Sequence, residues 1–413
     1  MNTGHTELER RVCARIAERR EALLADLTLH VELPTGLGNA AALDETRDRL
    51  CARLTALGAT REDIPGDERP AWLSWTRDAD AAGAGFSGAA PPTAVCRRAR
   101  PGLPRLLLAG HLDTVHDPLG SFRSLSVEPG GRRAVGPGCV DMKGGLVIAV
   151  AALEALESCG VACSWSFLMN SDEETGSYHS DRALRDEATR HDIGLALEPA
   201  MVDGGLAVAR GGSGMFRLDA VGRAAHVGRD FASGVSAVDI LARAILDAHS
   251  LSEPARGVCV NIGPLKGGLA PNVVADAASA WGNVRFPDDA CARALDSALH
   301  ALSGPSAHDP GRLAVHTSFN RPAKPTTPAV QQLAELARGA AEDLGQRLPF
   351  GTTAGVCDGN ILQAAGLPTI DTLGVRGGGL HTPEEWIDLS SLVERCQLLA
   401  VLMCRLSAGA MAG

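Results

Sequence analysis

The sequence has few aromatic residues, which make up 3% of its 413 residues. A buried core therefore has to consist mainly of Ala, Leu and Val, the apolar residues that the chain does contain. No apolar run reaches the roughly 18 residues that a membrane-spanning helix requires. Residues 1–21 are charged and lack an apolar signal core. We therefore expect no membrane partner.

Paired cysteines are also missing. The chain has 11 Cys, an odd number, and no C-x-x-C pair. Such usage is typical of reduced thiols rather than of a disulfide framework, so we expect a cytoplasmic protein. The net charge of −10 disfavours a nucleic acid or an anionic membrane surface as a partner, because both repel a negatively charged chain.

The remaining composition is that of an ordinary globular protein of two or three domains, with 45% hydrophobic residues and 47 Gly. Apolar runs of strand length alternate with longer stretches of helical periodicity. Helices are expected over residues 7–29, 39–57, 146–158, 327–344 and 390–406, and strands over 93–97, 106–109, 161–169, 192–197 and 367–374. This alternation predicts an α/β fold in which a mostly parallel sheet is flanked by helices.

The first candidate functional residues stand at the end of the strand over 106–109. His111 and Asp113 follow it, and their side chains lie on the same side of an extended segment, so they can converge. Ligand sites of open α/β sheets lie at the carboxyl ends of strands, and an imidazole held by a carboxylate is a usual metal ligand. A loop His beside a loop Asp, without function, is the alternative for this pair taken alone.

A second candidate lies in a Gly-rich turn at residues 136–145, which delivers Asp141 to the start of a helix. The turn matches neither G-x-x-x-x-G-K-[ST] nor G-x-G-x-x-G, which argues against nucleotide binding. A phosphate-cradling loop and a plain N-cap Asp are the structural alternatives.

Two further strand ends carry carboxylates. The strand expected over 161–169 ends shortly before Glu173 and Glu174, and the strand expected over 192–197 ends before Glu198. Consecutive acids repel one another unless a cation is present, although a solvated turn also explains them in isolation. Strand–helix alternation brings such ends to one edge of a sheet. The predicted cluster of carboxylates and an imidazole is the ligand set of hydrolytic zinc sites, which often hold two metals.

The pattern of apolar and polar residues changes between residues 208 and 320. Alternating and helical stretches follow one another there in the order βαββαβ, which predicts an inserted α+β domain. The first pattern then resumes, so residues 1–207 and 321–413 are predicted to form one discontinuous domain. A late segment, 377–385, carries His381 and two Glu residues.

The motifs occur in the order found in the two-zinc aminoacylase/carboxypeptidase family, which includes glutamate carboxypeptidases, acetylornithine deacetylase and succinyl-diaminopimelate desuccinylase. The chain resembles this family over nearly its whole length. The shared motifs are G-H-L-D-T-V, G-x-x-D-M-K-G-G, D-E-E-x-G-S, L-E-P and G-G-G-x-H-x-x-E-E. The resemblance implies two zinc ions per chain, with cobalt or manganese as substitutes. His111 and Glu198 would bind one ion, Glu174 and His381 the other, and Asp141 would bridge them.

The same resemblance implies the chemistry. A zinc-activated water would hydrolyse an amide bond and release an amino acid from a small peptide or an N-acyl amino acid. Glu173 would be the general base of this catalytic site, and Asp113 would stand behind His111. General bases typically contribute about 10²–10⁴-fold to a rate.

The resemblance also makes residues 208–320 a lid that forms the interface of a homodimer. His226, on a G-x-x-x-H-x-G loop, would reach into the partner's site and help to hold the oxyanion. Asn272, in a G-G-x-A-x-N segment, would contact the substrate, and Arg285 would pair with the substrate carboxylate. A surface loop and an ordinary salt bridge are the alternatives for His226 and Arg285. Cys357, which precedes the Asp-Gly near the last helix, stands where the family usually has Ser or Thr. This difference affects the expected shape of the wall of the site at that position.

Within the family, the lid segment 263–270 is most similar to that of the glutamate carboxypeptidases. We therefore predict a glutamate-carboxypeptidase-like zinc metallopeptidase. An N-acyl-amino-acid deacylase is the alternative enzyme. A metal-binding module without activity is the alternative from another class, and the intact Glu173 argues against it because binding alone needs no base.

Overall fold

The computed structural model describes residues 5–36, 38–74, 91–305 and 310–411. Most of the chain outside residues 212–321 forms one body, the large unit, around a six-stranded sheet of order β1-β2-β6-β3-β7-β15. Strands β6, β3, β7 and β15 are parallel, whereas β1 and β2 are antiparallel additions at one edge. The strands are β1 (Thr60–Ile64), β2 (Thr93–Arg98), β3 (Arg105–His111), β6 (Ser164–Asn170), β7 (Ile193–Ala196) and β15 (Thr369–Ile370).

Helices cover both faces of this sheet. They are α1 (Glu7–Ala17), α2 (Arg20–Glu32), α3 (Ala40–Ala56), α4 (Gly144–Ser158), α5 (Asp181–Arg190), α8 (Pro328–Asp343), α9 (Asp358–Ala364) and α10 (Ser390–Ser407). Leu106 and Leu108 of β3 face the core shared with α4 and α10, while Leu107 and Ala109 face α5 and α9. A strand buried on both faces reads as a continuous apolar run, which is why β3 was visible in the sequence.

Two smaller sheets extend the large unit. Strands β8 (Leu206–Arg210) and β14 (Phe350–Thr353) form a parallel pair. Strands β4 (Ser126–Val127), β5 (Arg133–Val135), β16 (Gly377–Gly378) and β17 (Trp386–Asp388) form a four-stranded sheet of order β16-β17-β5-β4. This second sheet brings the late segment with His381 next to the turn that carries Asp141.

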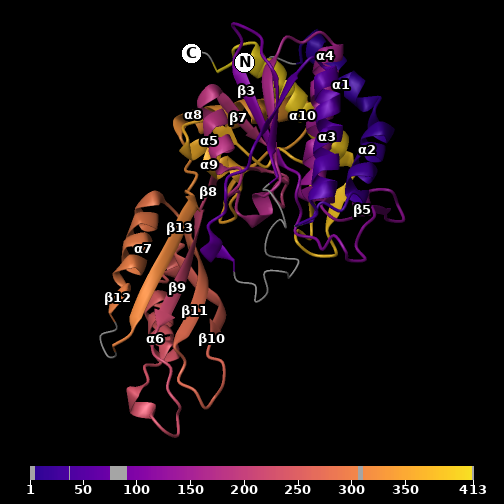
Figure 1. The fold of residues 1–413 in the computed structure, drawn as a ribbon. Coiled ribbons are helices and arrows are strands. Elements are labelled where there is room, and N and C mark those ends of the chain that lie inside the picture. The colour runs from indigo at the N-terminus through magenta and orange to yellow at the C-terminus, as the bar shows by residue number, and fades with distance from the viewer. Residues whose placement is uncertain (1–4, 37, 75–90, 306–309, 412–413) are drawn as a thin grey trace.

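Residues 212–321 form a separate body, the small unit, which projects from the large one (Figure 1). Its antiparallel sheet has the order β10-β11-β9-β13-β12, and α6 (Ala237–His249) and α7 (Asp289–Ala301) pack on it. The strands are β9 (Gly212–Val221), β10 (Cys259–Gly267), β11 (Ala277–Phe286), β12 (Gly304–Pro305) and β13 (Arg312–Arg321). In β9, Phe216, Leu218 and Ala220 alternate into the core under the helices. Met215, on the other face, lines a cavity.

The two units are joined where the chain crosses between them. Arg210 and Lys324 pair through their backbones, each N–H donating to the other's carbonyl oxygen at 2.9 Å. Their side chains form ion pairs with one buried carboxylate, Asp371, at 2.8 and 3.2 Å. A further contact comes from a segment before residue 75, where the Trp281 indole donates to the carbonyl of Trp72 at 2.6 Å.

The predicted α/β fold with a flanked, mostly parallel sheet is confirmed. The expected strand over 367–374 is shorter, because only Thr369–Ile370 pairs with β7. Among the described residues, no helix is both long and apolar enough to cross a bilayer.

Candidate metal centre

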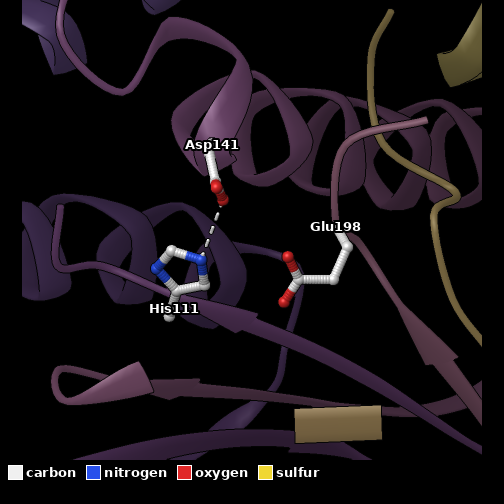
Figure 2. A group of neighbouring side chains, drawn as sticks. All are labelled: His111, Asp141 and Glu198. Carbon is white, nitrogen blue, oxygen red and sulfur yellow. Dashed lines mark hydrogen bonds and ion pairs between the residues drawn. The ribbon is translucent and has the colours of Figure 1, made fainter. Parts of the chain in front are cut away.

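The five side chains predicted as metal ligands meet at the carboxyl edge of the large sheet. Asp141 lies between two imidazoles, with its Oδ1 3.2 Å from His111 Nε2 and its Oδ2 3.5 Å from His381 Nε2. Figure 2 shows His111, Asp141 and Glu198 directed towards one another. In each of two groups the ligand atoms lie within 4.8 Å of one another: His111, Asp141 and Glu198 in the first, and Asp141, Glu174 and His381 in the second. Asp141 thus belongs to both groups.

The strand order explains why these residues meet. Strand β3 ends at His111, β6 ends just before the turn Glu173–Thr175, and β7 ends just before Glu198. These three strands are adjacent and parallel, so their carboxyl ends share one edge. Asp141 comes from the kinked turn Cys139–Lys143 that precedes α4, where its own backbone is not helical, and His381 comes from the loop after β16.

Asp113 organises this edge from behind. The backbone carbonyl of Asp113 lies 2.9 Å from His111 Nδ1, which leaves His111 Nε2 facing Asp141. The carboxylate of Asp113 accepts the backbone N–H groups of Glu173 and Glu174 at 3.2 and 3.0 Å. One buried Asp therefore fixes both the imidazole and the turn that carries the two Glu side chains.

A second buried acid, Glu385, belongs to the late motif, but the sequence alone predicted no role for it. Its carboxylate accepts the backbone N–H groups of Gly138, Val140 and Asp141 at 2.8, 2.9 and 3.0 Å. His116 Nε2 lies 2.6 Å from the same group. Glu385 is 1% exposed. It holds the turn that presents Asp141, and only its position next to Glu384 at the end of the motif gave a signal for this in the sequence.

The carboxylates of the cluster sit in an environment that suits cations. Burial raises the pKa of Glu198 well above its usual value and also raises the pKa of Glu174. Oε1 of Glu174 is buried without a hydrogen-bond partner among the described residues. Hydrogen bonds to Asp141 and Glu174 raise the pKa of His381 to about 10. Three carboxylates and two imidazoles with an unused oxygen therefore fit divalent cations that accept N and O ligands.

Glu173 has different surroundings from Glu174, although the two are adjacent. It belongs to neither group of ligand atoms. Burial raises the pKa of Glu173 to about 8, although the positive charge of Arg321 opposes this shift. Arg321 Nη1 lies 2.6 Å from Glu173 Oε1. Arg321 was not predicted from the sequence, because an Arg at the end of an amphipathic strand carries no motif.

A cavity of about 870 Å³ opens in front of the cluster, and its walls come from both units. Glu173 and Glu198 line it from the large unit, and Ser213, Asn283 and Arg285 line it from the small unit. Arg285 Nε donates to Asn283 Oδ1 at 3.1 Å, whereas Arg285 Nη1 is buried without a partner among the described residues. A guanidinium with an unused donor at a cavity wall can bind a carboxylate.

The structure does not bring His226 or Asn272 to this cavity. Both are exposed on paired loops of the small unit, where the backbone N–H of Val227 donates to the carbonyl of Asn272 at 3.0 Å. Neither residue lines the cavity of its own chain. Cys357 is buried at the N-terminus of α9, and its neighbour Val356 lines the cavity.

The chain matches known proteins over most of its length. A family model described as peptidase family M20/M25/M40 matches residues 107–405. Carboxypeptidase G2 of Pseudomonas sp. (strain RS-16) is 28% identical over 313 residues, which cover 74% of each chain. Succinyl-diaminopimelate desuccinylase of Parvibaculum lavamentivorans is 29% identical over 317 residues, or 70% of this chain and 77% of that protein. N-acetyl-L-citrulline deacetylase of Xanthomonas campestris pv. campestris is 29% identical over 308 residues, with 70% and 79% covered.

Solved structures share the fold. The aminopeptidase PepT of Bacillus cereus ATCC 10987 matches with a TM-score of 0.69 at 22% identity, covering 94% of this chain and 98% of that chain. The Bacillus subtilis YXEP protein, described as a dinuclear metal binding peptidase, matches with a TM-score of 0.65 at 14% identity, covering 95% and 99%.

Proposed function

This chain belongs to peptidase family M20/M25/M40 and is a hydrolase, and from this premise we propose that it is a two-metal carboxypeptidase that releases an amino acid from a small peptide or N-acyl amino acid. The observation that carries the proposal is the sharing of Asp141 between two groups of ligand atoms, beside a carboxylate that belongs to neither. Two cations and a separate base are the parts that metal-assisted amide hydrolysis needs.

The proposed cofactor is a pair of zinc ions. His111 and Glu198 would hold one ion, Glu174 and His381 the other, and Asp141 would bridge them. Imidazole and carboxylate ligands suit zinc, and cobalt or manganese could replace it. When bound, the cations would polarise the substrate carbonyl and lower the pKa of a water molecule.

Glu173 is the proposed general base. It lines the cavity beside the ligand groups, so it can accept a proton from the attacking water and pass it to the leaving amine. A raised pKa of about 8, caused mainly by burial, lies close to neutral pH, where proton transfer in both directions is efficient. Asp113 supports the base by binding its backbone N–H.

Arg285 is the proposed ligand for the carboxylate of the released amino acid. Its unused Nη1 and its place on the cavity wall support this role. Carboxypeptidase G2 among the relatives favours the carboxypeptidase reaction. The relatives named desuccinylase and deacetylase favour N-acyl-amino-acid deacylation as the second candidate. Both reactions leave a free carboxylate for Arg285.

The small unit is proposed to act as a lid and to form a homodimer. Several large apolar side chains of this unit are exposed, among them Phe231 at 66%, Leu246 at 70% and Leu269 at 98%. Burial of such side chains against a second copy would favour association. Dimerisation would also give His226 and Asn272 a function, since neither reaches the cavity of its own chain.

The test combines metal content with hydrolysis. Purified protein is assayed for metal per chain, and amine release is followed from N-acyl amino acids, dipeptides and benzoyl- or folyl-type glutamates, with and without a chelator. We expect about two metals per chain and release that the chelator abolishes. Protein that was never exposed to chelator and holds no metal would disprove the ligand assignment.

The role of Glu173 is tested in the same assay. Glu173→Gln keeps the volume of the side chain and removes the base, so it should retain metal and lose about 10²–10⁴-fold in turnover. Loss of metal instead would reverse the proposed roles of Glu173 and Glu174. The unmodified protein gives a further outcome. If it held metal but turned over none of the substrates, a metal-binding module without activity would be favoured.

A further inference from the structure

The proposed general base, Glu173, forms an ion pair with Arg321 of the small unit. We propose that Arg321 is a positioning residue, which fixes the carboxylate of Glu173 for proton transfer without touching the metal ligands. This inference rests on the proposed role of Glu173 as the general base. It assigns a function to the end of β13, which no motif identified.

Arg321 contacts both the side chain and the backbone of Glu173. Its Nη1 lies 2.6 Å from Glu173 Oε1, and its Nη2 donates to the backbone carbonyl of Glu173 at 2.7 Å. Nη2 also donates to Ser177 Oγ at 2.7 Å. A planar guanidinium that contacts three oxygens restricts its partners more than a single ammonium donor does. Two hydrogen bonds thus anchor the guanidinium to the 173–177 turn, and the ion pair places it beside the Glu173 carboxylate.

The position of Arg321 follows from an irregularity in β13. The pairing of β13 with β9 changes register between Ser318 and Arg321. Successive side chains of a regular strand point to opposite faces, but an extra residue in the strand redirects them. Here two consecutive side chains reach the same turn, because Asn320 Nδ2 donates to the carbonyl of Gly176 at 2.5 Å. The end of β13 is thus attached to the 173–177 turn at several points.

The contacts of Arg321 separate the base from the metal ligands. Among the described residues, the acids within 4.0 Å of the Arg321 guanidinium are Glu173 and Asp358, the latter at 3.9 Å. None of the five residues proposed to hold metal is in this set. Arg321 is 6% exposed, so its contacts with Glu173 are shielded from water. A change at Arg321 should therefore disturb the base and leave the metal in place.

The test compares Arg321→Gln and Arg321→Lys with the unmodified protein in metal content, kcat and KM. Misplacement of a catalytic group by about 1 Å can cost about 10²-fold, so we expect Arg321→Gln to lower kcat by that order with metal content and KM close to normal. Arg321→Lys keeps the positive charge but loses the planar guanidinium with its several donors. We therefore expect its kcat to lie between that of Arg321→Gln and that of the unmodified protein. Arg97→Gln is the matched control, because it breaks another ion pair with a buried acid, Glu187 (2.6 Å), in the large sheet.

Four results would overturn the proposal. An increase in KM with kcat unchanged would mean that Arg321 binds the substrate, and a loss of metal would mean that it supports the metal centre. A kcat loss of equal size in Arg97→Gln would mean a general effect of stability. If Arg321→Gln does not fold, Arg321→Lys decides alone, and a normal kcat in that variant contradicts the proposal. An active Glu173→Gln would instead disprove the proposed function itself.

Discussion

At the scale of single residues, partners rather than side-chain type separate the proposed roles of Glu173 and Glu174. Glu174 faces His381 at 3.3 Å, within a group of ligand atoms. Glu173 faces Arg321 at 2.6 Å and belongs to neither group. The backbone N–H groups of both bind Asp113, so the turn is held in one conformation. Two identical carboxylates can therefore take different parts in one reaction.

Glu385 offers a test of the support around the metal centre. Glu385→Gln removes the charge that three backbone N–H groups of the Asp141 turn share. Loss of such an outer contact typically weakens metal binding by about 10–100-fold. We expect this loss in a titration against a competing chelator, with kcat of the fully loaded enzyme largely kept. Glu384→Gln, at the exposed neighbour, is the control. Unchanged affinity in Glu385→Gln would contradict this account.

His30 should make the protein sensitive to acid. Burial, with repulsion from Lys143, Arg53 and Arg49, lowers the pKa of His30 to about 4. In the unfolded chain the pKa of His is about 6.5, so between these values the unfolded state binds a proton that the folded state does not. The free energy of unfolding therefore falls as pH falls from about 6.5 to about 4, by about 2 kcal/mol at pH 5 from this residue.

Denaturant unfolding of His30→Gln at about pH 7 and about pH 5 checks this prediction. The variant should lose less of its free energy of unfolding between the two pH values than the unmodified protein does. His249→Gln changes an exposed His of α6 and is the control. Equal losses in the unmodified protein and in His30→Gln would mean that His30 is not buried as a neutral group.

At the scale of elements, the start of α4 is packed against the end of β7. A Cβ added at Gly145 would lie 2.3 Å from the backbone carbonyl oxygen of Leu197, next to Glu198. Overpacking of this kind typically costs about 1–3 kcal/mol. We expect Gly145→Ala to lower the free energy of unfolding by that amount and to weaken metal binding, because the carbonyl that must move adjoins Glu198.

Gly339, inside α8, is the matched control for Gly145. Its Cβ would have its nearest neighbour at 4.0 Å. Ala is favoured over Gly in a helix by about 0.5–1 kcal/mol, so Gly339→Ala should stabilise the protein. Denaturant unfolding of the two variants should therefore give changes of opposite sign. Destabilisation by both would show that helix packing at these positions is not as described.

The elements that the sequence revealed are those whose burial is complete or one-sided. Strand β3 is apolar on both faces and α4 is buried along nearly its whole length, so local pattern was enough. Strands β5, β16 and β17 were not predicted. They have two or three residues each, and the pairing of β17 with β5 joins segments about 250 residues apart in the sequence. Local pattern contains no information about such pairing.

The candidate site was predictable to the extent that it lies in motifs. The residues predicted as metal ligands, together with Glu173 and Asp113, stand beside strand ends and turns, and the structure brings them together. Arg321 and Glu385 were missed for a physical reason. Their importance lies in partners that reach them only after folding, Glu173 for Arg321 and the Asp141 turn for Glu385.

At the scale of the whole molecule, the exposed apolar residues of the small unit predict its association. Leu246 of α6 is 70% exposed, and Val238 on the same helix is 43% exposed. Leu246→Glu should convert a dimer into monomers, because a buried unpaired charge is costly at an interface. Sedimentation velocity of the two proteins measures this. If His226 acts in the partner's site, hydrolysis should fall with the dimer.

Leu119→Glu is the control for this prediction. Leu119 is 81% exposed and belongs to the large unit, so its substitution should leave the association state unchanged. An unmodified protein that stays monomeric at high concentration would contradict the proposed dimer. So would a Leu246→Glu variant that remains dimeric.

The small unit leaves and rejoins the large one at a single backbone pair, Arg210 and Lys324. A segment whose two ends lie side by side can be exchanged for another without moving either end. Recombination between relatives at these two positions would replace the wall that carries Arg285 and leave the cluster around Asp141 in place. Under the roles proposed above, an incoming segment would have to keep an arginine at position 321, so that it can pair with Glu173. With that residue kept, the proposed substrate wall and the metal cluster could be varied separately.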